Sequence, residues 1–226
     1  MDKSDIHTLA GSQAKSLKAH IRAWDKEYCH RRWGGPAPIK NLQVHLLPGS
    51  KVLDAGSGNG RYLTELTKYY LTFGVDISVT ALSNSRTQLK RNGRFAEHIR
   101  SSIHKLPFKS HSFDGILCYG VLQHLFPDER EAAVMEFRRV LREGGLVFFE
   151  AFGSEDMRCG ENSSIPYEKN TFIRQNGLIY HYFTKEEVNT LFQEFETTEL
   201  DNLIKEKTFR GEAYKRHMIR GIFRKF

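Results

Sequence analysis

Residues 51–63 read KVLDAGSGNGRYL, in which a short apolar run is followed by a glycine at every second position and then by a helical pattern. Glycine adopts positive φ at no steric cost and lets other groups approach the backbone closely. A strand, a glycine turn and a helix in this order bring backbone N–H groups against a ligand. The glycines are Gly56, Gly58 and Gly60, and Asp54 stands where the strand ends. The stretch therefore predicts a strand–turn–helix unit that binds a ligand through its turn.

A second acidic residue narrows the choice of ligand. Asp76 ends the next apolar run, FGVD, 22 residues after Asp54. Nucleoside-binding folds place at about this spacing the carboxylate that holds the ribose hydroxyls. The glycine spacing is G-x-G-x-G, which disfavours the G-x-G-x-x-G turn of nicotinamide oxidoreductases. No Gly-Lys-Ser or Gly-Lys-Thr follows, which excludes a nucleoside-triphosphate P-loop.

The run D-A-G-S-G-N-G at the end of a first strand resembles motif I of the class I S-adenosylmethionine-dependent methyltransferases. Two later motifs resemble the methyltransferase type 11 group of that class: L-P-F at residues 106–108, with S-F-D before an apolar strand, and LREGG at residues 141–145 before another. The resemblance implies that the cofactor is S-adenosyl-L-methionine. It also implies that Gly56 and Gly58 pack against the methionine part of the cofactor and that Asp76 binds its ribose.

The same resemblance implies further cofactor contacts. Residues 106–108 would wall the adenine pocket. Ser102 stands where the family often has an aspartate that bonds the adenine amino group, and the Ile103 N–H is a second expected contact. The carboxyl end of the strand predicted over residues 113–119 falls where open α/β sheets bind ligands. The expected cofactor-binding residues are Asp54, Gly56, Ser57, Gly58, Gly60, Asp76, Ile77, Ser102, Ile103, Cys118 and Tyr119.

Hydrophobic periodicity and capping signals predict the helices. They are expected over residues 4–32, 39–47, from 61 onward, 79–91, 128–142 and 184–192. Ser78 is the predicted cap of the helix over residues 79–91, and Thr184 with Glu187 makes a capping box. Gly144 and Gly145 are expected to end the helix over residues 128–142.

Apolar runs between these helices predict strands over residues 95–100, 113–119, 146–152, 195–204 and 214–223, in addition to those of the first two motifs. We expect an α/β, Rossmann-like class I methyltransferase fold. Its mostly parallel seven-stranded sheet has the family's order 3-2-1-4-5-7-6, with helices on both faces. Residues 1–48 would form an N-terminal helical lid and residues 49–226 the cofactor-binding domain. Residues 153–180 show little regular pattern and are expected to be a substrate-side insertion.

The candidates for chemistry lie around the end of the fourth strand. His124 is the histidine that the motifs place there, and it is a candidate general base because an unperturbed imidazole titrates near neutrality. We favour instead a packing or hydrogen-bonding role for it. The residues expected to contact the methyl acceptor are Tyr28, Arg32, Trp33, Tyr180 and Tyr182. The three cysteines are isolated from one another, so no metal site is expected.

The positive charge is concentrated at one end of the chain. The net charge is +7, and residues 203–226 contribute +6 of it, from 8 basic and 2 acidic side chains. We favour the interpretation that this charge protects a sheet edge. The alternative is that it contacts RNA phosphates. No apolar run is long enough to cross a membrane and no signal peptide is evident, so a cytoplasmic location without membrane attachment is expected.

These observations lead to one principal functional hypothesis and two alternatives. The principal one is an S-adenosylmethionine-dependent methyltransferase whose acceptor is a small molecule, because the central part of the chain is almost neutral. The first alternative is an RNA methyltransferase acting on tRNA or rRNA, which the basic end of the chain favours. The other is a non-catalytic cofactor-binding partner subunit. Methyl transfer requires a general base only where the acceptor must lose a proton, so the lack of an evident catalytic triad excludes none of the three.

Overall fold

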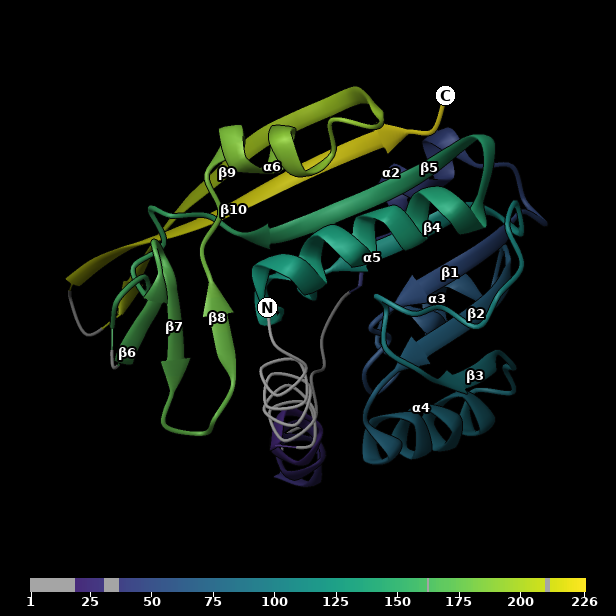
Figure 1. Ribbon diagram of the computed structural model, residues 1–226. Coiled ribbons are helices and arrows are strands. Elements are labelled where there is room, and N and C mark those ends of the chain that lie inside the picture. The colour runs from purple at the N-terminus through teal and green to yellow at the C-terminus, as the bar shows by residue number, and fades with distance from the viewer. Residues whose placement is uncertain (1–18, 31–36, 162, 210–211) are drawn as a thin grey trace, which may run out of the picture.

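The computed structural model describes residues 19–30, 37–161, 163–209 and 212–226 (Figure 1). A seven-stranded sheet runs through the molecule in the order β3-β2-β1-β4-β5-β10-β9. Its strands are β1 Lys51–Ala55, β2 Leu71–Asp76, β3 Glu97–Arg100, β4 Phe113–Tyr119, β5 Leu141–Phe152, β9 Glu196–Phe209 and β10 Glu212–Arg224. The first five are parallel, whereas β10 is antiparallel to both β5 and β9. Numbered along the chain, this is the expected order 3-2-1-4-5-7-6.

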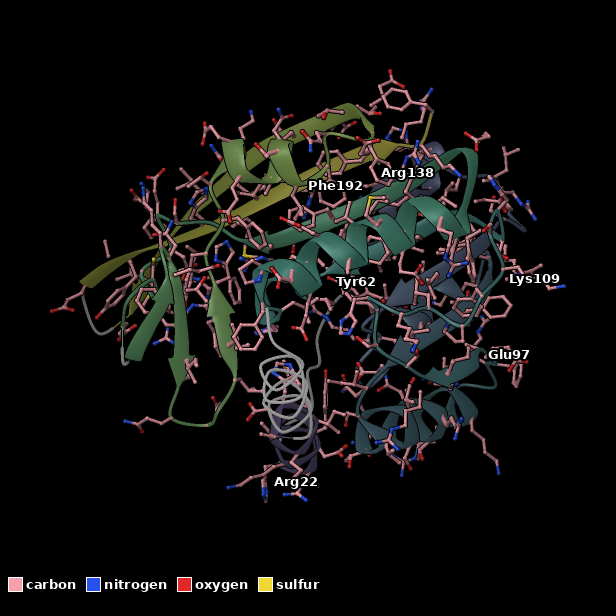
Figure 2. The ribbon with its side chains drawn as sticks, viewed as in Figure 1. Arg22, Tyr62, Glu97, Lys109, Arg138 and Phe192 are labelled. Carbon is pink, nitrogen blue, oxygen red and sulfur yellow. The ribbon has the colours of Figure 1, made fainter. Side chains whose placement is uncertain are left out.

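Helices cover both faces of the sheet (Figure 1). They are a helix over residues 19–30, α2 Lys40–His45, α3 Leu63–Leu66, α4 Val79–Arg91, the 3₁₀ turn η1 Leu122–His124, α5 Pro127–Val140 and α6 Lys185–Leu191. On one face, Phe137 of α5 and Phe192 after α6 (Phe192 is labelled in Figure 2) are packed in the same buried cluster as Phe149 of β5. On the other, Leu42 of α2 is packed with Phe148, the residue of β5 that precedes Phe149. The alternation of side chains along β5 thus supplies both halves of the core.

Several elements lie where the sequence predicts them. The observed bounds of α4 and β4 are the predicted ones, and the Ser78 side chain caps α4 by accepting from the Ala81 N–H. The capping box of α6 is also confirmed, since the Thr184 Oγ1 accepts from Glu187 N and the Glu187 carboxylate accepts from Thr184 N. Local hydrogen-bonding signals of this kind depend on few residues and survive tertiary packing.

Two of the helices that differ from the prediction do so for a clear physical reason. The helix after the glycine turn is α-helical only over Leu63–Leu66, because the chain must turn back by Leu71 to enter β2. The helix α5 ends at Val140 rather than at Gly144 and Gly145. Leu141 is fully buried and pairs with Phe113 of β4, so it leaves the helix and enters the sheet. The two glycines lie within β5, beside the irregularity in its pairing with β4.

The insertion over residues 153–180 is more regular than the sequence suggests. It forms a three-stranded antiparallel sheet of β6 Ser163–Glu168, β7 Thr171–Arg174 and β8 Ile179–His181. A bridge between Gly153 and Phe183 joins the two ends of the insertion beside β5. Figure 1 shows this small sheet to one side of the large one, beyond the end of β5. These strands have 6, 4 and 3 residues, which is too short for a two-residue period to stand out in the sequence.

Candidate active site

The glycine turn has the left-handed backbone geometry that its sequence predicts. Gly56, Gly58 and Gly60 all have positive φ, at +83°, +53° and +81°. A side-chain carbon on Gly58 would lie 2.5 Å from the Tyr28 Oη, and one on Gly56 would lie 2.5 Å from Val121. The turn is therefore closed to any other residue type, for steric as well as conformational reasons.

Two buried carboxyl groups flank this turn. Asp76 accepts hydrogen bonds from the N–H groups of Gly58 at 2.8 Å and Ser78 at 2.9 Å. Burial raises the pKa of Asp76 to about 6 in spite of these bonds. Burial, with the charge of Asp76 adding to it, raises the pKa of Asp54 to about 8. Asp54 Oδ2 is buried without a hydrogen-bond partner among the described residues, which is unusual for a native structure.

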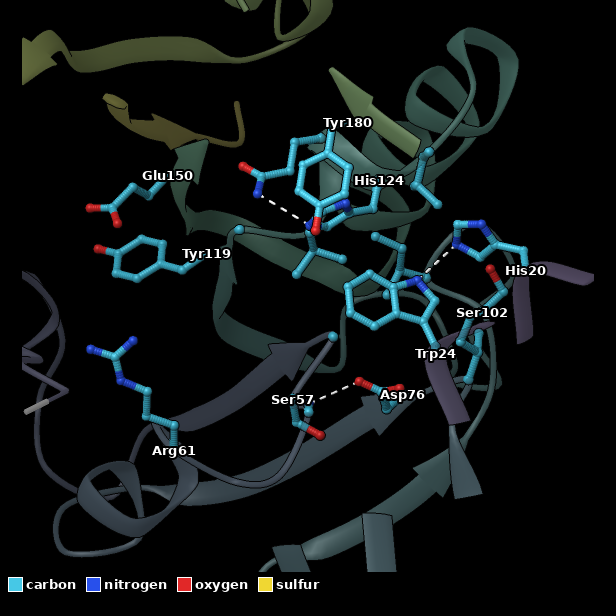
Figure 3. A pocket seen from close by; sticks show the side chains of 18 of the residues that line it. His20, Trp24, Ser57, Arg61, Asp76, Ser102, Tyr119, His124, Glu150 and Tyr180 are labelled. Atoms are coloured by element: carbon cyan, nitrogen blue, oxygen red, sulfur yellow. Dashed lines mark hydrogen bonds between the residues drawn. The ribbon is translucent and has the colours of Figure 1, made fainter. Parts of the chain in front are cut away.

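A cavity of about 400 Å³ opens beside the turn (Figure 3). Its lining includes eight of the expected cofactor-binding residues: Gly56, Ser57, Gly58, Asp76, Ile77, Ser102, Ile103 and Tyr119. The other three lie behind this lining. Asp54 and Cys118 are buried under it, and Gly60 is packed against Ser85 of α4. The Ser102 hydroxyl is bonded to the His104 ring at 2.8 Å.

The N-terminal helix over residues 19–30 forms one wall of the cavity. His20, Trp24 and Tyr28 line it, and the Trp24 Nε1 donates to the His20 Nε2 at 2.9 Å. Figure 3 shows the Trp24 ring between the His20 ring and the body of the cavity. Of the expected acceptor contacts, Tyr28 and Tyr180 line the cavity. Arg32 and Trp33 lie outside the described residues.

His124 is held by hydrogen bonds on both ring nitrogens. Its Nδ1 lies 2.6 Å from the Ile179 carbonyl oxygen, so Nδ1 must carry the proton, and Nε2 then accepts from the Gln123 side-chain amide at 3.2 Å. The Gln123 Oε1 in turn accepts from Phe152 N at 2.9 Å. Burial lowers the pKa of His124 to about 4, the bond to Ile179 opposing the shift. These contacts support the hydrogen-bonding role, in which His124 fastens β8 to the large sheet.

Aromatic rings form the wall next to His124. Its ring meets Trp24 and Tyr180 edge to face, at centroid distances of 4.9 and 4.8 Å. The Tyr180 ring is parallel to that of Phe152, which also lines the cavity. Tyr182 does not line it: this side chain is buried, and its hydroxyl accepts from Arg174 at 2.8 Å. Tyr182 lies one residue beyond the end of β8.

Some residues of the cavity were not predicted from the sequence. They are His20, Trp24, Asn59, Arg61, Tyr62, Glu150, Phe152, Arg158 and Met218, among others. Glu150 lies near the carboxyl end of β5 and is bonded to Arg220 of β10 at 2.5 and 3.0 Å. The rule that ligands bind at carboxyl ends of strands could have indicated Glu150 and Phe152. Nothing in the local pattern marks Arg158, because its place depends on the fold of the insertion.

The positive charge of β10 is largely paired with acidic side chains. Lys215 is paired with Glu155. Arg216 donates from its Nε to Asp156 at 2.8 Å, and Arg220 is bonded to Glu150. The described residues contain no group of three side chains that could hold a metal ion. None of the helices among them is both long enough and apolar enough to span a bilayer.

Comparison with known proteins places this site in a family. Residues 53–149 match the family model described as "Methyltransferase domain". The tRNA N(3)-cytidine methyltransferase METTL2 of Danio rerio is 25% identical over 82% of this chain and 57% of its own length. Its counterpart in Drosophila melanogaster is 26% identical over 89% of this chain and 66% of its own length. The chain thus spans less than two thirds of these curated relatives.

A shorter and closer similarity involves a putative methyltransferase of Encephalitozoon cuniculi, 36% identical over 55% of this chain and 54% of its own. Among solved structures, a SAM-dependent methyltransferase of Methanosarcina mazei superposes with a TM-score of 0.73. It is 25% identical in sequence, over 84% of this chain and 99% of that one. The family match, the sheet order and the glycine turn agree, and they identify residues 53–149 as the core of a class I S-adenosylmethionine-dependent methyltransferase domain.

Proposed function

We propose that this chain transfers the methyl group of S-adenosylmethionine to a base of an RNA, with tRNA as the RNA class. The relatives carry the proposal. Proteins named as tRNA N(3)-cytidine methyltransferases align with 82% and 89% of this chain. The match to the methyltransferase family model, at residues 53–149, covers less than half of this chain. Those alignments therefore extend into the segments that surround the acceptor side of the cavity.

The cavity residues fit the cofactor. A side-chain carbon on Gly56 or Gly58 would meet Val121 or Tyr28, which both line the cavity, so the turn lies directly against it. Asp54 has a buried side-chain oxygen without a hydrogen-bond partner among the described residues. In the proposed arrangement Asp76 accepts from the ribose hydroxyls, and the backbone of Ile103 contacts the adenine. The bound cofactor supplies a methyl group already activated by its positively charged sulfur. The chain contributes binding and alignment, which can account for roughly 7–11 kcal/mol of barrier lowering.

The aromatic wall suits a flat acceptor ring. Bases that are taken out of an RNA strand stack on aromatic side chains, and enzymes that modify a base bring it out of its stack. Trp24, Tyr180 and Phe152 line the cavity and offer such surfaces. A ring nitrogen with a free electron pair attacks the methyl group directly and needs no general base. This agrees with a His124 whose nitrogens are both engaged.

A small-molecule acceptor is the second candidate, and one observation favours it. Much of the positive charge near the C-terminus is neutralised within the fold, since Arg216 and Arg220 are bonded to Asp156 and Glu150. Less of that charge is then left for phosphates than the net value suggests. A non-catalytic partner subunit is the third candidate. It would bind the cofactor without turnover.

The experiment uses the purified chain, S-adenosylmethionine labelled in its methyl group, and total tRNA. We expect label in the RNA, recovered after nuclease digestion as one methylated nucleoside that mass spectrometry identifies. Unlabelled RNA together with label in a metabolite extract would replace the proposal with the small-molecule function. Cofactor binding measured by calorimetry, without turnover on either acceptor pool, would point to the partner subunit. Gly58→Val, which cannot form the turn, is the control for contaminating activity.

A further inference from the structure

Arg158 lies between β5 and β6 and lines the cavity together with Phe152 and Tyr180. Its guanidinium carbon is 4.2 Å from the centroid of the Phe152 ring, so the charged group lies on an aromatic surface. About a third of the side chain, 32%, is exposed. Arg61, the other arginine of the lining, lies over Tyr62, next to the glycine turn. Arg158 therefore lies on the side of the cavity away from the glycine turn, where Phe152 and Tyr180 would face the methyl acceptor; we call this the acceptor side.

Arg158 is held by its side chain and by its backbone. Its Nε donates to Asp156 Oδ1 at 2.8 Å, and the Asp156 side chain is fully buried. The other Asp156 oxygen accepts from Arg216 Nε at 2.8 Å and from His217 N at 3.1 Å, both in β10. The Arg158 carbonyl oxygen accepts from Arg174 Nη2 of β7 at 2.6 Å. The Arg158 side chain is thus held through Asp156 to β10 and its backbone to β7, so little of its conformational entropy remains to be lost on binding.

One end of the guanidinium has no partner. Its Nη2 is buried and makes no hydrogen bond to the described residues. A buried charged donor without an acceptor is costly, and a ligand oxygen that pairs with it recovers that cost. Because Nε is engaged by Asp156, the two terminal nitrogens form the edge that is left. Such an edge matches two oxygens of a carboxylate or a phosphate.

We propose that Arg158 is the anion-binding residue for the methyl acceptor, gripping an oxyanion next to the ring that is methylated. This proposal rests on the proposed function for the identity of the anion. In an RNA the oxyanion is a backbone phosphate that flanks the extruded base. In a small acceptor it is a phosphate or carboxylate carried by the molecule itself. Asp156 acts through Arg158 as a positioning residue.

The test compares ligands that differ in one charged group. Calorimetry on the full chain loaded with S-adenosylhomocysteine measures CMP against cytidine for a phosphate, and orotate against uracil for a carboxylate. We expect the wild type to bind one charged member at least about tenfold more tightly than its neutral partner, the scale of a charge-assisted hydrogen bond. The pair that shows the preference identifies the oxyanion. A wild type without preference in either pair overturns the proposal.

Arg158→Met keeps the apolar stem and removes the charge, and Arg158→Lys keeps the charge and removes the two-pronged edge. Both are expected to lose most of the preference. Arg142→Ala is the matched control, since Arg142 is paired with Asp114 on the surface and does not line the cavity. It should keep the whole preference. A preference that persists in both Arg158 variants overturns the proposal, and an unchanged S-adenosylhomocysteine affinity in the same samples shows that the variants are folded.

RNA binding provides a readout that separates this proposal from the proposed function. Each phosphate contact adds about 0.7–0.9 to the slope of the logarithm of affinity against the logarithm of salt concentration. If tRNA is the substrate, Arg158→Met should lower that slope by about one contact, and Arg142→Ala should not. If labelled tRNA is never formed, the proposed function fails, while the CMP and orotate comparisons still decide the role of Arg158.

Discussion

Ser78 links the N-terminal helix to the cofactor-binding half of the fold. Its Oγ–H donates to the Asp25 Oδ1 at 2.6 Å, and the same oxygen accepts from Ala81 N at 3.1 Å as the cap of α4. Asp25 lies one turn before Tyr28 on the helix over residues 19–30, and Tyr28 lies against the glycine turn. Asp25 Oδ1 also accepts from Thr80 N at 3.3 Å, so two hydrogen bonds to one carboxylate help to hold this wall of the cavity in place.

The first prediction concerns this contact. Asp25→Ala should weaken S-adenosylhomocysteine binding by roughly 1.5–3 kcal/mol, the scale of a hydrogen bond to a charged group, because the helix is less firmly held over the turn. Calorimetry measures the affinity. Lys26→Ala, at an exposed position of the same helix, is the control and should bind as the wild type does. Equal affinities for Asp25→Ala and the wild type would show that the helix is held by its other contacts alone.

The second prediction separates backbone strain from close approach at the glycine turn. Gly58 and Gly93 both have positive φ, but a side-chain carbon on Gly93 would meet nothing within 4 Å, whereas one on Gly58 would meet Tyr28. Both alanine variants should lose about 1–2 kcal/mol of unfolding free energy from the left-handed backbone. Only Gly58→Ala should also lose cofactor binding. Thermal melts and calorimetry on both variants decide, and a similar loss of binding in Gly93→Ala would contradict the interpretation.

The sequence predicts elements well where local signals and burial agree. Helix α4 has Ser78 as a cap and buries Ala81, Leu82 and Leu89 on one side, so both of its ends follow from the pattern. The strand β4 is an apolar run that is buried along most of its length. The turn at Gly58 could also be predicted locally, because its positive φ restricts the residue type to glycine.

The acceptor side could not be predicted in the same way. Arg158 reaches the cavity only because Asp156 is bonded to β10, sixty positions further along the chain. Trp24 belongs to the cavity because its helix is bonded to α4, 53 positions away. Contacts between such distant segments leave no local period. The early end of α5 has a similar cause, because the pairing of Leu141 with Phe113 overrides the glycine signal.

The third prediction follows from the raised pKa of Asp54, which burial shifts from 3.8 to about 8. Between these two pH values the folded chain binds more protons at this site than the unfolded chain, so the unfolding free energy falls as pH rises. The contribution is complete below about pH 4 and is lost by about pH 8. Asp54→Asn removes this titration. Its melting temperature should therefore decline less between pH 5 and pH 8.5 than that of the wild type, and parallel curves would contradict the raised pKa.

The fourth prediction tests the role of His124. Asparagine can still donate to the Ile179 carbonyl oxygen from its side-chain amide, so His124→Asn should keep most of the turnover, whereas His124→Leu should lose stability. Because burial lowers the pKa of His124 to about 4, the pH–rate profile of the wild type should show no step from this group between pH 5.5 and 8. A loss of a hundredfold or more in kcat for His124→Asn, with an unchanged melting temperature, would instead indicate a general base.

The last prediction concerns the positive charge of β9. Lys205 and Lys207 are exposed, and in the hairpin they pair with Arg216 and Tyr214. Cross-strand partners point to the same face, and Met218 on that face of β10 lines the cavity. The two lysines thus extend the cavity face outward, where an RNA strand could pass. If each contacts a phosphate, reversing both charges should lower the salt slope of tRNA binding by about two contacts.

Reversal of Arg216 provides the comparison for these lysines. Its guanidinium is bonded to Asp156, whose side chain is fully buried and is also paired with Arg158. Arg216→Glu would remove one of these two positive partners and place a second negative charge beside the buried carboxylate, which should destabilise the hairpin. Lys205→Glu with Lys207→Glu should instead leave the melting temperature close to that of the wild type, because exposed charges contribute little to stability. Filter binding of tRNA over a range of salt concentrations gives the slope. If the double lysine variant changes solubility and leaves the slope intact, the charge on β9 protects a sheet edge, and the RNA must reach the cavity by another face.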